Sequence, residues 1–240
     1  MNAQRAVIVK MEPGLSWQEC HIAAELEIVK GLFQIGIIQL PEWEVKSGDK
    51  EFDDLITERE LERLVREHRL GAVFMPHGMG HLIGIDTHDV GGYVEDGRTP
   101  ERSPLPGLKS LRTARKLEVN MVLTVEPGCY FIDHLLDEAL AEDSPLRFYL
   151  NKDLLEDYRE YGGVRLEDVV VVTAPTPCET SVNARGHSCV RNFTLCPRTV
   201  QEVEHVMSGG NWPPKVDEAP ELRRLRLTEP WSPLPSPPSR

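Results

Sequence analysis

Apolar residues recur at helical spacing in two segments near the start of the chain. The first segment opens with the capping-box pattern Ser16-Trp17-Gln18-Glu19 and ends at Gly36. Its apolar positions are Trp17, Cys20, Ala24, Ile28, Leu32 and Ile35. The second segment begins near Asp53 or Thr57, stops before Gly71, and has the apolar positions Leu61, Leu64 and Val65. This spacing predicts two helices that each bury one face in the core.

Strand patterns appear in the second half of the chain. Residues 120–133 alternate between apolar and polar types around a Pro-Gly pair, which predicts two strands separated by a turn. Residues 163–173 predict a further strand, whose alternation places Arg165, Glu167, Val169 and Val171 on one face. Burying an unpaired carboxylate is costly, so we expect Glu167 to have a cationic partner. Arg165, a metal ion, or both would serve.

The periodic pattern is lost after Thr173. Residues 174–193 predict an atypical loop insertion, and residues 194–207 predict a turn followed by a short helix. From Ser208 the chain is rich in proline and ends in PWSPLPSPPSR. Such a segment has too little apolar surface to offset its ordering entropy. We therefore expect one domain over residues 1–207 and a disordered tail over residues 208–240.

Charge and composition exclude several kinds of partner. The 240-residue chain carries a net charge of −12, which argues against binding to nucleic acid or to an anionic membrane. We find neither a signal-peptide core at the start nor a run of ~20 apolar residues. We therefore expect a cytoplasmic protein whose five cysteines are thiols.

Candidate chemistry is concentrated in residues 74–93, where three histidines, two aspartates and five glycines occur in FMPHGMGHLIGIDTHDVGGY. His77 and His81 are one helical turn apart, but each intervening glycine costs a helix about 1 kcal/mol. A turn is therefore favoured over a helical metal pair. His81 together with Glu126 and Glu167 would make an imidazole–carboxylate site suited to Mn, Co, Zn or Fe. Spacing alone leaves open that these are surface or satisfied core residues.

Three ordered motifs give the chain a resemblance to a known family. They are HGMGHLIGIDTHDVGG, LTVEPGCYF and GGVRLEDVVVVT, and they resemble those of the prolidase (Xaa-Pro dipeptidase) branch of the pita-bread metallopeptidases. The match runs from about residue 13 to 173 and resumes in LCPRTVQEVEHVM. It implies an α+β fold, a partial pita-bread catalytic domain. It also implies metal-dependent hydrolysis of dipeptides that end in proline, as in the turnover of collagen and other proline peptides.

The resemblance also implies a ligand set. His81, Glu126 and Glu167 match the family's metal ligands, with Glu167 bridging two ions. Mn²⁺ is the expected metal, and Zn²⁺ or Co²⁺ are alternatives. Such a centre makes hydroxide available near neutral pH, and Glu126 can relay the proton to the leaving proline nitrogen. His77 is expected to lie just behind the ligands, and the glycines to let the backbone crowd the metal centre.

Three further residues match substrate-binding positions. His88 resembles the histidine that contacts substrate and helps to stabilise the tetrahedral intermediate. Arg112 and Arg165 resemble the arginines that line the site. Arg112 in particular would hold the carboxylate of the dipeptide, because a guanidinium group binds a carboxylate through two parallel hydrogen bonds.

The sequence departs from the family pattern in one respect. The family's dinuclear site uses two more aspartates on strands that precede the first helix, and this chain begins at about that helix. We therefore expect a truncated form that binds one ion or none. Three hypotheses follow: an active dipeptidase, a catalytically incomplete variant that acts as a weak metal-binding or regulatory chain, and a mononuclear iron oxygenase. A homodimer, or pairing with a full-length chain, is expected in the first two cases.

Overall fold

The computed structural model describes residues 1–41, 49–94, 97, 100–177, 187–214, 217 and 220–225. Its α-helices are α1 (Asn2–Lys10), α2 (Trp17–Gln34), α4 (Lys50–Arg66), α5 (Gly71–Phe74), α6 (Asp133–Leu140), α7 (Lys152–Glu156) and α8 (Val200–Met207). Its 3-10 turns are η1 (Leu108–Ser110), η2 (Pro145–Tyr149), η3 (Arg159–Tyr161) and η4 (Pro220–Leu222). Its strands are β1 (Val122–Val125), β2 (Gly128–Tyr130), β3 (Gly163–Arg165), β4 (Asp168–Pro177) and β5 (His187–Asn192). We find no helix among these residues that is long and apolar enough to cross a membrane.

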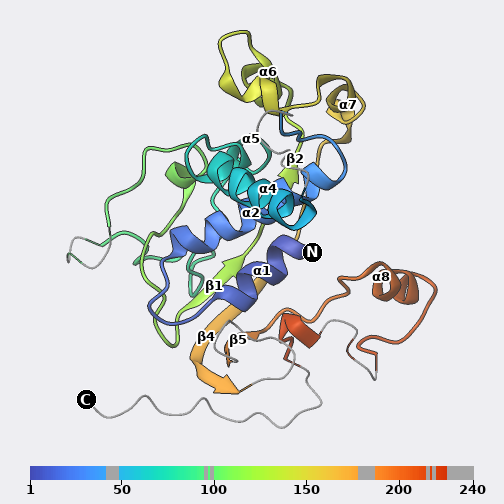
Figure 1. The fold of residues 1–240 in the computed structure, drawn as a ribbon. Coiled ribbons are helices and arrows are strands. Elements are labelled where there is room, and N and C mark those ends of the chain that lie inside the picture. Colours follow the sequence, from blue (N-terminus) through green and yellow to red (C-terminus); the bar gives the residue numbers. More distant parts are fainter. Residues whose placement is uncertain are drawn as a thin grey trace.

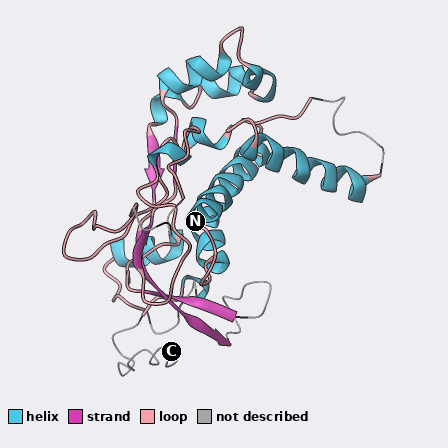
Figure 2. Ribbon diagram, turned by 90° about the vertical axis from the view of Figure 1, so that its left-hand side faces the viewer, coloured by secondary structure: helices cyan, strands magenta, loops and turns pink. Residues whose placement is uncertain are grey.

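The molecule is built from helices packed on an antiparallel sheet (Figure 1). The sheet has the strand order β1-β4-β5, and β2 pairs with β3 in a smaller sheet. The long helices lie together on one side of the strands (Figure 2), where α1 contacts α2, β1 and β5. The largest fully buried side chains are Trp17, Phe74, Ile8, Met11, Ile37, Ile38, Leu64, Leu70, Met75, Met79, Leu111 and Leu123. These side chains form one continuous core.

Both predicted helices are confirmed. In α2 the Ser16 hydroxyl accepts a hydrogen bond from the backbone N–H of Gln18, while Glu19 pairs with Arg66 of α4 at 3.0 Å. Gly36, at φ +83°, follows the end of the helix. The second helix starts at Lys50, earlier than expected, because the Asp49 side chain caps the N–H groups of the first turn.

The strands of residues 120–133 and 163–173 are interrupted at matching places. β1 pairs with β4 until Val125 faces Asp168, and β2 pairs with β3 from Gly128 opposite Arg165. Between the two ladders lie Glu126-Pro127 on one side and Leu166-Glu167 on the other. Proline has no N–H to donate, which favours a break at this point. Glu126 and Glu167, the two glutamates predicted as metal ligands, therefore lie opposite each other where the antiparallel pairing is interrupted.

The expectation of one continuous strand over residues 163–173 is therefore wrong. Arg165 lies in the smaller sheet, and the Glu167 side chain is exposed rather than buried among valines. Val170 and Val172 are fully buried and Val171 is 3 % exposed. The break removes the strict alternation on which the shared face of Arg165, Glu167 and Val171 depended.

The loop expected over residues 174–193 is also wrong where the structure describes it. β4 continues to Pro177, and β5 runs antiparallel to it, with Val172 opposite Val190 and Thr176 opposite Ser188. Residues 178–186 lie outside the described residues. Alternation in the sequence is weak here, and pairing with the buried strand β4 determines the extended conformation.

The expectation that the packed domain ends at residue 207 is wrong, because described residues beyond Ser208 pack against the rest of the chain. The short helix predicted over residues 194–207 is confirmed as α8, capped reciprocally by Thr199 and Glu202. Further along, Trp212 Nε1 donates to the Leu195 carbonyl at 3.1 Å, and Leu222 is fully buried. Residues 226–240 lie outside the described residues.

The substitution Glu202→Gln is expected to reduce the loss of folding stability that the protein shows as pH falls from 4.5 toward 2. Burial raises the pKa of Glu202, but hydrogen bonds from Arg224 and from the N–H groups of Arg198 and Thr199 outweigh it and hold the pKa at about 2, against 4.5 normally. The folded protein thus binds this proton less readily than the unfolded chain. The resulting stability is present above pH 4.5 and is lost as pH falls toward 2. Its upper bound is about 3 kcal/mol.

Urea unfolding at several pH values checks this expectation. Glu204→Gln, an exposed neighbour on α8, is the control and should keep the wild-type loss of stability between pH 4.5 and 2. The same loss of stability with falling pH in Glu202→Gln and Glu204→Gln would contradict a stabilising role for the Glu202 carboxylate.

Candidate metal centre

A backbone ladder brings two of the predicted ligands side by side. The stretch 79–83 runs along the free edge of β1, where the N–H groups of Glu126 and Thr124 donate to the carbonyls of Met79 and His81 at 2.8 and 2.9 Å. Thr124 N–H and the His81 carbonyl thus form one rung, and Glu126 lies two residues further along. His81 is in a loop rather than in a helix, as expected from its glycine neighbours.

The glycines allow this loop to lie against neighbouring backbone. A Cβ atom on Gly80 would lie 2.0 Å from the Thr124 carbonyl oxygen, and one on Gly78 would lie 2.7 Å from the Ser110 carbonyl oxygen. Neither site has room for a side chain. The close approach is thus made to β1 and to residues 110–111, whereas the sequence suggested an approach to the metal centre itself.

The His81 imidazole is oriented for binding a cation. Its Nδ1 lies 2.9 Å from the Leu82 carbonyl oxygen, so that Nδ1 carries the proton and Nε2 has a free lone pair. Nε2 lies 3.3 Å from Oε1 of Glu126. The Thr124 hydroxyl donates to the same oxygen at 2.9 Å and accepts the His81 N–H at 2.9 Å. Thr124 therefore holds both side chains in place.

The third predicted ligand joins this pair from the other gap in the strands. His81, Glu126 and Glu167 each offer one ligand atom, and these atoms lie within 4.8 Å of one another. One imidazole and two carboxylates, with a formal charge of −2, fit a divalent cation such as Mn²⁺ or Zn²⁺. Searching the described residues reveals this group and no other of its kind. The geometry is as expected, and the role of the three residues as ligands stays a prediction.

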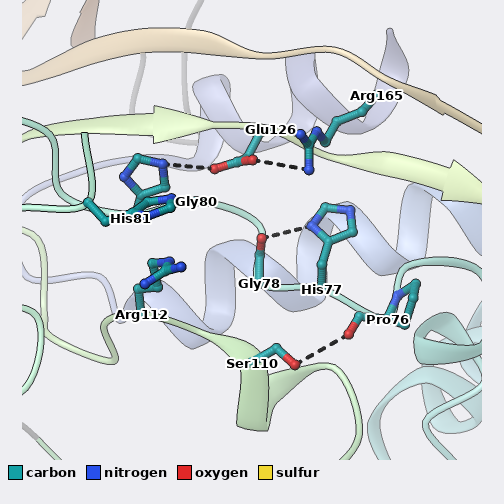
Figure 3. Close-up of a pocket in the computed structure, with 10 residues that line it drawn as sticks. Pro76, His77, Gly78, Gly80, His81, Ser110, Arg112, Glu126 and Arg165 are labelled. Atoms are coloured by element: carbon teal, nitrogen blue, oxygen red, sulfur yellow. Dashed lines mark hydrogen bonds and ion pairs between the residues drawn. The ribbon is translucent and has the colours of Figure 1, made fainter.

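Two of the three residues, His81 and Glu126, line a cavity of about 290 Å³ (Figure 3). Its lining residues are Pro76, His77, Gly78, Gly80, His81, His88, Ser110, Arg112, Glu126 and Arg165. Arg165 reaches Glu126 Oε2 at 3.6 Å, so its partner is Glu126 and not Glu167 as the strand pattern suggested. Arg112 is the second guanidinium group of the cavity.

His88 and His77 are the other two histidines that line the cavity. The His88 ring meets the His81 ring edge-on, with centroids 4.4 Å apart. Lost hydration and the nearby positive charge of Arg112 lower the pKa of His88, which keeps its imidazole neutral at neutral pH. His77 contacts the Gly78 carbonyl at 2.9 Å and the Tyr130 ring, and burial lowers its pKa.

Sequence reasoning missed Thr124 and Ser110. Thr124 precedes Glu126 by two residues, which on a strand is the same face, and that spacing could have identified it. Ser110 donates to the Pro76 carbonyl at 3.3 Å, a contact between segments that the sequence does not connect.

Comparison with known proteins places this geometry in a family. The model of metallopeptidase family M24 matches residues 1–174. The Xaa-Pro dipeptidase of Homo sapiens is 44 % identical over 209 residues, which cover 87 % of this chain and 35 % of that protein. A probable Xaa-Pro aminopeptidase, pepP, of Talaromyces marneffei is 32 % identical, with coverage of 87 % and 37 %.

Among solved structures, the aminopeptidase PepP of Pseudomonas aeruginosa aligns with 27 % identity and a TM-score of 0.46, covering 86 % of this chain and 32 % of that one. The chain thus spans about a third of the length of its relatives. The partial pita-bread α+β fold expected from the sequence is confirmed by the family match, which extends over most of the chain. The chain belongs to metallopeptidase family M24.

Proposed function

We propose that this site takes part in the metal-dependent hydrolysis of Xaa-Pro dipeptides. The observation that carries the proposal is that His81, Glu126 and Glu167 come close together, and that His81 and Glu126 line a cavity that two arginines also line. The substrate class is suggested by relatives that are Xaa-Pro dipeptidases, up to 44 % identical to this chain. Membership of a peptidase family removes the reason to consider an iron oxygenase.

The chain's own residues divide the work of the reaction. Arg112 would bind the substrate carboxylate, and a neutral His88 would donate a hydrogen bond to the reacting carbonyl. Glu126, whose two oxygens contact Thr124 and Arg165, would accept a proton from the attacking water and pass it to the leaving nitrogen. A divalent cation held by His81, Glu126 and Glu167 would supply Lewis acidity and lower the pKa of bound water. Mn²⁺ is our proposed metal, with Zn²⁺ or Co²⁺ as alternatives.

The proposal includes a compartment and an assembly. We place the reaction in the cytoplasm, because the described cysteines Cys20, Cys129, Cys189 and Cys196 are thiols. We also infer a homodimer or a pairing with a longer chain. In the described residues β3 has one strand neighbour, β2, so its other edge is available to a strand. Light scattering of the purified protein distinguishes a monomer from a dimer.

Release of proline from Gly-Pro tests the proposed reaction. We expect slow release that requires added Mn²⁺ and that disappears in His81→Ala. His134→Ala is the matched control, because His134 is exposed and pairs with Glu138 on α6. Release that persists in His81→Ala would reject the proposed site. The absence of release from the wild-type chain would favour a catalytically incomplete, regulatory chain.

Arg112→Lys is expected to raise KM for Gly-Pro by about 10- to 100-fold with little change in kcat. A lysine is a point charge that cannot form the two parallel hydrogen bonds, and a hydrogen bond to a charged group is worth about 1.5–3 kcal/mol. Steady-state kinetics with varied Gly-Pro measures the effect. Arg115→Lys is the control, because Arg115 pairs with Glu118 and is not among the cavity residues. Equal KM values for the two variants would contradict the role of Arg112.

A further inference from the structure

The predicted ligand Glu167 is held differently from the other two. Glu126 has Thr124 and Arg165 on its carboxylate oxygens, and His81 is fixed through the Leu82 carbonyl. Within the part of the chain that the structure describes, the Glu167 carboxylate has no hydrogen-bond or ion-pair partner, and the side chain is exposed. Its place near the other ligands therefore depends on its backbone.

Residues from the C-terminal part of the chain hydrogen-bond to the backbone and side chains around Glu167. The guanidinium group of Arg198 donates to the Glu167 carbonyl oxygen and to the carboxylate of Asp168. Asp168 is fully buried, and the Arg198 side chain is 11 % exposed. A buried carboxylate that loses its cation costs several kcal/mol, so this pair resists separation.

Two more hydrogen bonds link Asp168 and Val169 to the same C-terminal segment. Asn192 Nδ2 donates to the second Asp168 oxygen at 2.8 Å. The Val169 N–H donates to the Thr194 hydroxyl at 2.8 Å. Three consecutive residues, 167–169, are thus bound by residues 192–198. The link between β3 and β4, which carries Glu167, is fixed at its C-terminal end by a segment distant in sequence.

We propose that Arg198 is a positioning residue that sets the affinity of the site for a divalent cation, acting through the backbone of Glu167. The inference rests on the proposed function, because it takes Glu167 to be a metal ligand. Groups that orient a ligand without touching the metal typically change metal affinity by 10- to 100-fold. Arg198 would do so from the main chain instead of from the ligand side chain.

The proposal is tested by titrating the 240-residue chain with Mn²⁺ and measuring the free Mn²⁺ by electron paramagnetic resonance. Arg198→Gln is expected to weaken Mn²⁺ binding by about 10-fold or more. Arg198→Lys keeps a cation beside Asp168 but loses one of the two contacts, so we expect an intermediate loss. It also carries the test if Arg198→Gln does not fold. The matched control is Arg159→Gln, which removes an arginine that is paired with Asp133, Asp137 and Glu156 and is not among the cavity-lining residues.

A double-mutant cycle separates positioning from general destabilisation. If Arg198 acts through Glu167, then Arg198→Gln should not weaken Mn²⁺ binding further in a Glu167→Ala background. Additive losses, or equal losses for Arg198→Gln and Arg159→Gln, would overturn the inference. Mn²⁺ affinity that is unchanged in Glu167→Ala alone would instead reject the proposed ligand set. Failure of the inference and failure of the proposed function therefore give different results.

Discussion

A polypeptide of residues 1–240 is expected to bind one Mn²⁺ ion and no second one, and to cleave Gly-Pro at least about 100-fold more slowly than its longer human relative assayed in parallel. The proposed ligands His81, Glu126 and Glu167 carry a formal charge of −2. Two divalent ions about 3.5–4 Å apart carry +4. At an effective dielectric constant of about 20 they repel each other by about 17–19 kcal/mol. The two carboxylates can neutralise the charge of one divalent ion, but only half the charge of two such ions.

One ion can polarise a carbonyl, but it cannot also clamp the attacking and the leaving group as a pair of ions does. Metal analysis of the purified protein by mass spectrometry, combined with proline release, measures both parts of the expectation. His81→Ala, which removes one of three ligands, sets the baseline for adventitious metal. Two tightly bound ions with a rate close to that of the human relative would refute the argument from charge.

Gly80→Ala is expected to lower the free energy of unfolding by about 3 kcal/mol or more and to abolish Mn²⁺ binding. The new methyl group would lie 2.0 Å from the Thr124 carbonyl oxygen and 2.9 Å from the Trp17 ring. Both neighbours are fully buried, and overpacking of this kind forces the backbone to shift. The shift would also strain the hydrogen bond from Trp17 Nε1 to the Gly80 carbonyl.

Gly31→Ala is the matched control for that substitution. Gly31 lies within α2, and an added Cβ atom meets nothing within 4 Å. Alanine is the better helix former, so this variant should gain about 0.5–1 kcal/mol. Urea unfolding with Mn²⁺ titration separates the two cases. A Gly80→Ala protein as stable as Gly31→Ala would show that the stretch 79–83 can move away from β1 at little cost.

The sequence predicted those features that are encoded locally. Ser16 and Gly36 mark the ends of α2 because capping and left-handed turns depend on a few adjacent residues. The start of α4 at Lys50, after the cap Asp49, was missed because an acidic, weakly apolar first turn gives no periodic pattern. β5 was missed because it is extended through pairing with β4, a contact that local sequence does not determine.

The candidate site divides in the same way. Motif resemblance named His81, Glu126 and Glu167, and the structure brings the three together. The exposed environment of Glu167 could not be predicted from alternation. The strand that carries Glu167 is interrupted because it pairs with a segment that is itself broken at Pro127. Arg198 was likewise hidden, since it acts across a long sequence separation, and so was the contact of Thr124 with His81.

The ladder between residues 79–83 and β1 has a consequence for how an ion would be taken up. Strand side chains alternate between faces, so a slip of register by one residue would turn either His81 or Glu126 away from the other. The backbone hydrogen bonds fix that register through groups of the protein alone. The entropic cost of bringing these two ligands together therefore belongs to folding and not to ion capture. A cation would meet a preassembled chelate, and whatever loosens the ladder should weaken the fold and the chelate together.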